Sequence, residues 1–159
     1  MSDTAQQSVY AIDSCSLTAL RRIYPERAFP QVWQLVETLA SSGRIISVED
    51  VLIELEAFDD VIKQWVIAHE SIFLPLTADV QTAARAILAA YPTLVDVKKR
   101  KSSADPFLIA VAQVRSAVLV TEEKISGGPG RVKIPDVCRG LGMSCIPLLQ
   151  MLLDEGLGA

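Results

Sequence analysis

The side chains most able to do chemistry in this chain are its carboxylates. The 159 residues include 10 Asp and 9 Glu against 15 Lys and Arg, which gives a net charge of −4 at pH 7. There is only one His, and there are three Cys. Carboxylates act as general acids and bases, or they bind hard divalent cations through oxygen. The informative ones are those that stand where a solvated surface residue is not expected.

The single histidine and the three cysteines exclude several kinds of site. His69 has no nucleophile motif beside it, so a Ser-His-Asp triad is disfavoured and a helix-end or surface histidine is expected. A zinc site would need His69 with Cys15, Cys138 and Cys145, whose spacing matches no ligand pattern such as C-x-x-C. An odd number of cysteines argues against a disulfide framework and favours a reducing, cytoplasmic location.

Composition predicts one globular domain over residues 1–159. Half of the residues are hydrophobic, which is enough to bury a core and too many for a disordered chain. The first residues are polar and lack the basic start of a signal peptide. No apolar run approaches the roughly 18 residues that span a membrane, so no membrane contact is expected.

Short apolar runs alternate with amphipathic segments of helix length, which predicts an α/β fold with a mainly parallel central sheet. The strands are expected at residues 9–12, 44–46, 71–74, 118–121 and 144–146, and the helices at residues 30–40, 48–57, 60–69, 77–91, from 105, 135–140 and from 148.

Three acids follow strands of this predicted sheet. Asp13 comes directly after the first strand, and Glu122 and Glu123 come after the strand at residues 118–121. Ligands of parallel sheets bind outside the carboxyl ends of the strands, so these acids share the ligand-binding edge. For Asp13, a role as a turn residue or helix N-cap explains its position as well as ligand binding does. The two glutamates could equally be solvated surface residues.

Glu54 adjoins the apolar stripe of a helix. Ser47 and Asp50 have the form of a capping box, so that helix is expected to start there. Glu54 lies three residues after Val51 and four before Phe58, which places it beside the buried face. A carboxylate there must be paired, protonated or metal-bound, unless its side chain reaches the solvent.

Asp105 and Asp136 lie at predicted helix starts. Asp105 precedes Pro106, and an N-cap Asp followed by proline accounts for it structurally. A capping Asp can also direct its second oxygen into a cleft. Asp136 follows Pro135 and is explained in the same way as a cap of a short helix.

Acids from distant segments therefore map to one edge of the sheet. Two unit charges about 4 Å apart repel by roughly 4 kcal/mol at an effective dielectric constant near 20. Such a cluster requires raised pKa values or divalent cations, and an oxygen-only ligand set favours Mg²⁺ or Mn²⁺. Two-metal sites of this kind hydrolyse phosphodiesters.

Along nearly its whole length the chain resembles a PIN domain, the ribonuclease fold of VapC-like toxins and RNA-processing nucleases. The opening segment, residues 9–17, looks like the family's apolar strand followed by Asp, a hydroxyl residue and Leu, although Cys15 replaces the usual Ser or Asn. Glu54 looks like the family's helical glutamate. Asp105 looks like the acid that opens its next conserved helix. Glu123 stands where the family more often has Asp.

The resemblance implies a three-layer α/β/α fold and an endoribonuclease that depends on Mg²⁺ or Mn²⁺. The implied catalytic residues and metal ligands are Asp13, Glu54, Asp105 and Glu123. Asp136 looks like a further metal-binding acid of an uncharacterised prokaryotic subgroup. Water would attack an RNA phosphodiester and leave a 5′-phosphate. An antitoxin protein and a second copy of the chain are further expected partners.

Four consecutive basic residues precede Asp105. They are expected to guide RNA phosphates into the site, although a solvated charge run is the alternative interpretation. These residues are Lys98, Lys99, Arg100 and Lys101.

Two other function classes remain open. The same fold without catalysis would be an interaction module, with Trp33, Phe58 and Trp65 either at a dimer or partner surface or in the core. A phosphoacceptor or hydrolase with Asp13 as nucleophile is disfavoured, because such hydrolases carry a second acid two residues on, where this chain has Cys15.

Overall fold

The computed structural model describes residues 7–56, 60–95, 104–126 and 132–158. These parts hold five strands and eight α-helices around one core. The strands are β1 (Tyr10–Ile12), β2 (Ile45–Val48), β3 (Phe73–Leu74), β4 (Val118–Val120) and β5 (Cys145–Ile146). The helices are α1 (Ser14–Ile23), α2 (Pro30–Ser41), α3 (Glu49–Glu56), α4 (Asp60–Ala68), α5 (Ala78–Ala90), α6 (Asp105–Arg115), α7 (Ile134–Leu141) and α8 (Leu148–Asp154), with 3₁₀ turns at Glu70–Ile72 and Pro92–Leu94.

The five strands form one sheet in the order β3-β2-β1-β4-β5, and every pair is parallel. Tyr10 of the central strand lies opposite Ile45 on one side and Val118 on the other. All three residues of β1 are buried, as expected for a parallel strand covered on both faces. The prediction of a mainly parallel sheet is thus confirmed.

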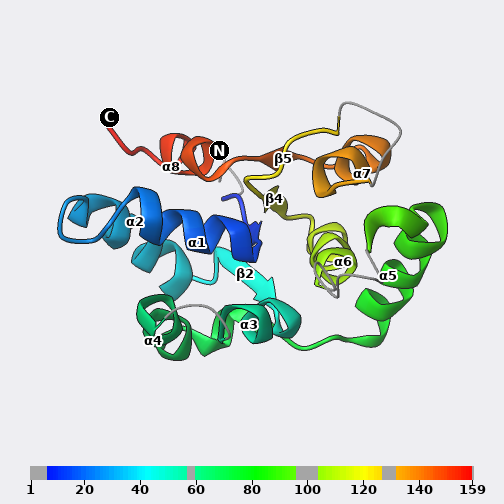
Figure 1. Cartoon of the computed structure of the whole chain (residues 1–159), viewed down its shortest axis with the longest axis horizontal. Coiled ribbons are helices and arrows are strands. Elements are labelled where there is room, and N and C mark those ends of the chain that lie inside the picture. Colours follow the sequence, from blue (N-terminus) through cyan, green and yellow to red (C-terminus); the bar gives the residue numbers. More distant parts are fainter. Residues whose placement is uncertain (1–6, 57–59, 96–103, 127–131, 159) are drawn as a thin grey trace, which may run out of the picture.

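Helices cover both faces of the sheet, which gives three layers (Figure 1). Helices α1, α2 and α8 lie on one side, and α6, α5 and α7 lie on the other. Crossovers between parallel strands are right-handed, so the helices change face when the chain reverses its direction across the sheet. That reversal occurs after β3, when the chain returns to place β4 beside β1. The switch point of the fold therefore lies between β1 and β4.

Helix α6 is the buried centre of its layer. Residues 108–112 of this helix are all buried, and α5 packs along its outer side. A helix that is apolar all round needs such cover on more than one side. Because α6 also contacts β1, β2 and β4, its first residue is held at a fixed place relative to the switch point.

A polar group anchors the end of the chain to the start of the sheet. The Tyr10 hydroxyl donates to Glu155 Oε1 at 2.9 Å, and Arg44 forms an ion pair with the same carboxylate. Burial, followed by the hydrogen bond to Glu155, raises the pKa of Tyr10 to about 12. Glu155 thereby joins the segment after α8 to β1 and to the residue before β2.

The helix starts differ from expectation at two positions. Ser47 lies in β2, and its hydroxyl donates to the Ile12 carbonyl at 2.7 Å, so the predicted capping box is wrong. Asp105 is the first residue of α6 and Ala104 is the N-cap, so Asp105 does not occupy the predicted cap position. His69 directly follows α4, which confirms the prediction of a helix-end histidine.

Within the described residues, no helix is both long and apolar enough to cross a membrane.

The core can be tested with a matched pair of leucines. Leu119 of β4 is 0% exposed, whereas Leu149 of α8 is 49% exposed. We expect Leu119→Ala to lower the free energy of unfolding by about 2–5 kcal/mol, because it leaves a cavity in the central layer. Leu149→Ala should change it by less than about 1 kcal/mol. Urea unfolding followed by circular dichroism measures both, and equal losses would contradict the burial pattern.

Candidate functional site

Asp13 stands at the switch point of the sheet. It follows β1 and caps α1, and its Oδ1 accepts a hydrogen bond from the Ser16 backbone N–H at 2.8 Å. Its Oδ2 accepts a hydrogen bond from the Thr121 hydroxyl, which lies directly after β4. The side chain is only 4% exposed. Asp13 is therefore both the predicted N-cap and an acid at the ligand-binding edge.

The electrostatic state of Asp13 reflects its burial. Desolvation raises the pKa of this carboxyl from 3.8 to about 6, and the negative charge of Glu123 acts in the same direction. The hydrogen bonds from Thr121 and Ser16 oppose the shift because they stabilise the charged form. At neutral pH the carboxylate is mostly ionised. A cation nearby would compensate this buried negative charge.

Thr121 joins the two strands that flank the switch point. Its hydroxyl donates to Asp13 and accepts from the Glu123 backbone N–H at 3.1 Å. The side chain is 2% exposed, which is unusual for a residue after the end of a strand. Sequence reasoning placed Thr121 at the end of a strand, in the segment that leads to Glu123, and assigned it no role in the site. Its position two residues before Glu123 was the available signal.

The adjacent glutamates after β4 are used in different ways. Glu122 is exposed, and its Oε1 accepts from the Leu148 N–H, the first residue of α8, at 2.8 Å. Glu123 is half-buried, and its Oε2 accepts from the Ile134 N–H, the first residue of α7, at 3.1 Å. Glu123 also contributes to the pKa of Asp13, whereas Glu122 is turned toward α8.

Glu54 lies half-buried on α3, beside the buried Val51 and Leu55. Its Oε2 accepts a hydrogen bond from the Ser14 hydroxyl at 2.8 Å. Ser14 is the first residue of α1 and the neighbour of Asp13. The contact therefore brings the α3 acid to the N-terminal end of α1. Phe58, the third member of the predicted stripe, lies outside the described residues.

Cys15 lies within the electrostatic range of four acids. Desolvation raises the pKa of its thiol to about 12, and negative charges add to the shift. Those charges belong to Asp13, Glu123, Asp105 and Glu54. Asp105 is 9% exposed at the start of α6. The segment after β4, the β1–α1 junction, α3 and α6 thus each carry a carboxylate whose charge acts on this thiol.

The four carboxylates do not form a closed coordination group. Across the four described segments, no group of three or more His, Cys, Asp and Glu side chains is placed to hold a metal ion. Glu54 and Glu123 are bound to Ser14 and to the α7 backbone instead. The donor set still suits Mg²⁺ or Mn²⁺, since it consists of carboxylate oxygens around a buried negative charge.

Asp136 is engaged at the N-terminus of α7. Its carboxylate accepts from the Lys133 N–H at 2.9 Å and from the Ser126 hydroxyl at 3.0 Å. Partial desolvation raises the pKa of this carboxyl, but the hydrogen bonds from Lys133 and Ser126 outweigh it and hold the pKa below its usual value. Asp136 is the third residue of α7 and its side chain accepts from the backbone of Lys133, the N-cap residue, so it caps the start of the helix from inside. Its contacts with described residues do not include the other four acids.

The predicted RNA-binding residues Lys98, Lys99, Arg100 and Lys101 lie outside the described residues.

These features define an α/β protein with a doubly wound parallel sheet and a cluster of carboxylates at its switch point. The chain belongs to the family described as Domain of unknown function (DUF4411), which matches residues 10–158. No curated protein matches the chain.

Removing the buried charge of Asp13 should stabilise the metal-free protein. The folded state holds its Asp13 proton more tightly than the unfolded chain, so stability declines as the pH rises from about 4 to 6. The Asp13→Asn variant has no ionisable group at this position, so it does not lose stability over this pH range. We expect it to raise the free energy of unfolding by up to about 3 kcal/mol at pH 7.5. The gain should disappear near pH 3.5.

Urea unfolding in EDTA at both pH values measures this difference. Asp154→Asn is a matched control, because Asp154 is exposed and pairs only with Gln150 among the described hydrogen bonds. A gain that persists unchanged at pH 3.5 would show that it does not arise from the buried charge.

Proposed function

We propose that this protein is a metal-dependent endoribonuclease with a PIN-like fold. The observation that carries the proposal is geometric: Ser14 and Thr121 tie Glu54, Asp13 and the backbone of Glu123 to the β1–α1 junction. Asp105 begins α6, the helix that packs on β1, β2 and β4. The fold supports it, because ligands of doubly wound sheets bind at the switch point where Asp13 lies. RNA is proposed as the substrate because the four segments resemble those of PIN-domain ribonucleases.

The four carboxylates would hold Mg²⁺ or Mn²⁺. When bound, the cation would lower the pKa of a water and offset charge on the phosphodiester. The residues around the acids fix their orientation. Ser16 and Thr121 hold the two oxygens of Asp13, and Ser14 holds Glu54.

Glu123 and Asp136 connect the site to α7. Glu123 accepts from the first backbone N–H of this helix, while Asp136 closes the helix start through Lys133 and Ser126. In this proposal Asp136 is a positioning residue that fixes the helix to which Glu123 is bonded. A role as a fifth ligand would require it to leave these partners.

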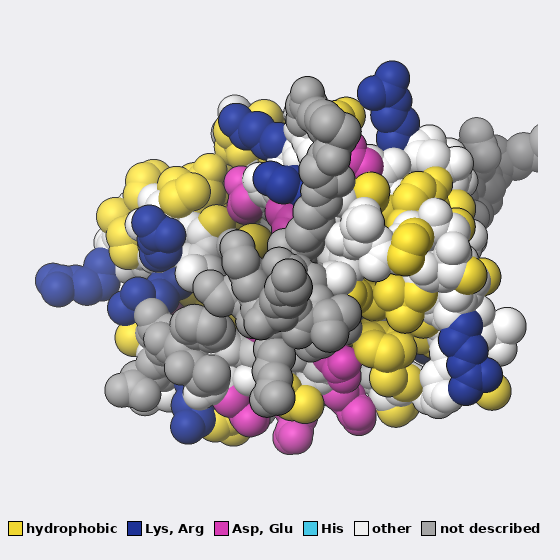
Figure 2. All heavy atoms as spheres, turned by 45° about the vertical axis from the view of Figure 1, so that its right-hand side comes forward, with side chains coloured by type: hydrophobic (Ala, Val, Ile, Leu, Met, Phe, Trp, Pro, Cys, Tyr) yellow, Lys and Arg dark blue, Asp and Glu magenta, His cyan; other side chains and the backbone are white. Residues whose placement is uncertain are grey.

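RNA binding by a chain with a net charge of −4 requires local positive charge. Among the described residues on the face shown in Figure 2, the Lys and Arg side chains are scattered rather than gathered in one patch. The run at residues 98–101 precedes Asp105 by only four positions, so its position along the chain supports contact with the phosphates. Bound cations would offset the remaining negative charge.

The biological setting that we propose is a toxin–antitoxin pair in the cytoplasm, with this chain as the toxin and an antitoxin protein as its partner. The resemblance to VapC-like proteins supports this setting, and it also supports a homodimer. A small antitoxin reading frame beside the gene would be the simplest supporting observation.

Adjacent glutamates provide a matched test of the nuclease. Glu123→Gln should reduce cleavage of single-stranded RNA with Mn²⁺ by about 100-fold or more, since it removes a charged oxygen from the site. Glu122→Gln should keep wild-type activity, because that side chain faces α8. EDTA should abolish cleavage by both proteins. Equal activities of the two variants would contradict the proposed site.

The basic run can be tested through the salt dependence of RNA binding. Replacing Lys98, Lys99, Arg100 and Lys101 together with Gln should weaken binding to single-stranded RNA. The slope of log K against log salt should become shallower by up to about 3, because about 0.7 counterions are released per neutralised phosphate of a single strand. Fluorescence anisotropy at several salt concentrations measures the slope. An unchanged slope would identify a solvated charge run.

A catalytically silent interaction module is the second candidate. The observation that favours it is that Glu54 and Glu123 already have protein partners, and that the described acids do not form a closed metal group. Calorimetric titration with Mn²⁺ separates the two candidates. Binding that is lost in Asp13→Asn supports the nuclease, and no binding at millimolar Mn²⁺ supports the module.

A further inference from the structure

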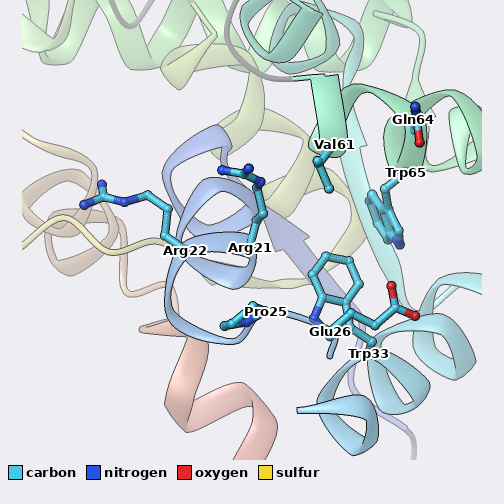
Figure 3. Close-up of a pocket in the computed structure, with 8 residues that line it drawn as sticks. All are labelled: Arg21, Arg22, Pro25, Glu26, Trp33, Val61, Gln64 and Trp65. Carbon is cyan, nitrogen blue, oxygen red and sulfur yellow. The ribbon is translucent and has the colours of Figure 1, made fainter. Parts of the chain in front are cut away.

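A hollow of about 710 Å³ lies at the end of α1 opposite to the carboxylates. Its walls come from the last turn of α1, the turn after it, α2 and α4 (Figure 3). The size is that of a small-molecule site. Both tryptophans of the chain, Trp33 and Trp65, line it together with Arg21, Glu26, Val61 and Gln64.

The two indole rings are held in place by the protein itself. Trp33 Nε1 donates to the Tyr24 carbonyl. Trp65 stacks on the His69 ring, with centroids 4.2 Å apart and an angle of 19° between the planes. His69 is fixed in turn by the Trp65 carbonyl and by Glu37. His69 therefore covers one face of the Trp65 ring. The Trp65 ring itself borders the hollow, as Figure 3 shows.

Charged groups of both signs complete the walls. Figure 3 shows Arg21 across the hollow from Trp65, while the Glu26 carboxylate lies beside Trp65 and Trp33. A guanidinium binds phosphate oxygens, and a carboxylate accepts the N–H groups on the edge of a nucleobase. An acidic peptide would meet Arg21 favourably but would bring negative charge to Glu26. An aromatic ring between the Arg21 guanidinium and the Glu26 carboxylate suits a nucleotide better than an acidic peptide.

We propose that this hollow binds a nucleotide, with its base stacked against the half-buried Trp65 ring and its phosphate at Arg21. The nucleotide is either one unit of single-stranded RNA or a free mononucleotide. The first source rests on the proposed ribonuclease function. Asp13 and Arg21 are eight residues apart on α1, about 12 Å along the axis, so one RNA strand could reach both places.

Intrinsic fluorescence tests the proposal directly, because both fluorescent indoles line the hollow. The full chain is titrated in EDTA with 5′-GMP, ribose 5-phosphate or a short single-stranded RNA, with excitation at 295 nm. EDTA removes any metal-dependent cleavage, so the result does not depend on whether the protein is a nuclease. We expect saturable quenching by GMP or by the RNA, and at least tenfold weaker binding of ribose 5-phosphate.

Three variants assign the binding to this hollow. Trp65→Leu should weaken nucleotide binding about tenfold, whereas Trp65→Phe should retain part of it, since base stacking on an aromatic ring is worth this much. Arg21→Gln should weaken binding several-fold and reduce its salt dependence. Arg27→Gln is the matched control, because Arg27 is exposed and is not among the lining residues.

Each outcome bears on the proposal. Quenching by RNA alone supports the RNA source, and quenching by GMP as well supports free mononucleotide binding. Absence of saturable quenching by either ligand overturns the proposal. Equal affinities for GMP and ribose 5-phosphate would also overturn it, because they would show an anion site without base recognition. Quenching by a short peptide of Glu and Leu but not by nucleotides would identify a protein-docking site instead.

Discussion

The buried carboxylate of Asp13 is the constraint on which the rest of the site depends. It lies between β1 and β4, the two strands where the chain reverses direction across the sheet, and it binds both α1 and the residue after β4. Desolvation makes its charge costly in the metal-free state. The protein compensates with two hydrogen bonds to this carboxylate, from Ser16 and Thr121. The ionised carboxylate that makes this edge of the sheet negative therefore lowers the stability of the metal-free fold.

Sequence reasoning located this edge because a parallel sheet brings the carboxyl ends of its strands together, whatever their order in the chain. It therefore placed Asp13 and Glu123 correctly relative to the strands. The predictions were wrong where a residue type that is typical of a helix N-cap occupies another position in the fold. Ser47 matches a helix cap but bonds to the Ile12 carbonyl across the sheet, and Asp105 matches a cap but lies inside α6. Thr121 was missed because its role exists only once β1 and β4 are adjacent.

Helix α1 connects the two functional regions that we propose. Its N-terminus carries Asp13, and Ser14 on its first turn binds Glu54. Its last turn carries Arg21 and Arg22, where positive side chains also interact favourably with the helix dipole. Charge is thus unevenly distributed along this helix, with a carboxylate at its start and two guanidinium groups at its end. A polyanion approaching the molecule would meet repulsion at one end of the helix and attraction at the other, until cations reach the acidic end.

The hydrogen bond between Thr121 and Asp13 spans 108 positions of the chain. The central strand β1 is made early, while its neighbour β4 follows three helical crossovers later. Pairing of parallel strands that are distant in the chain is slow, because the entropy of closing the long intervening segment is lost before the contacts are gained. During synthesis on the ribosome, the acidic edge cannot assemble until β4 has left the exit tunnel. Any activity that resides there would therefore be absent from the nascent chain while its first three strands and the helices between them are being made.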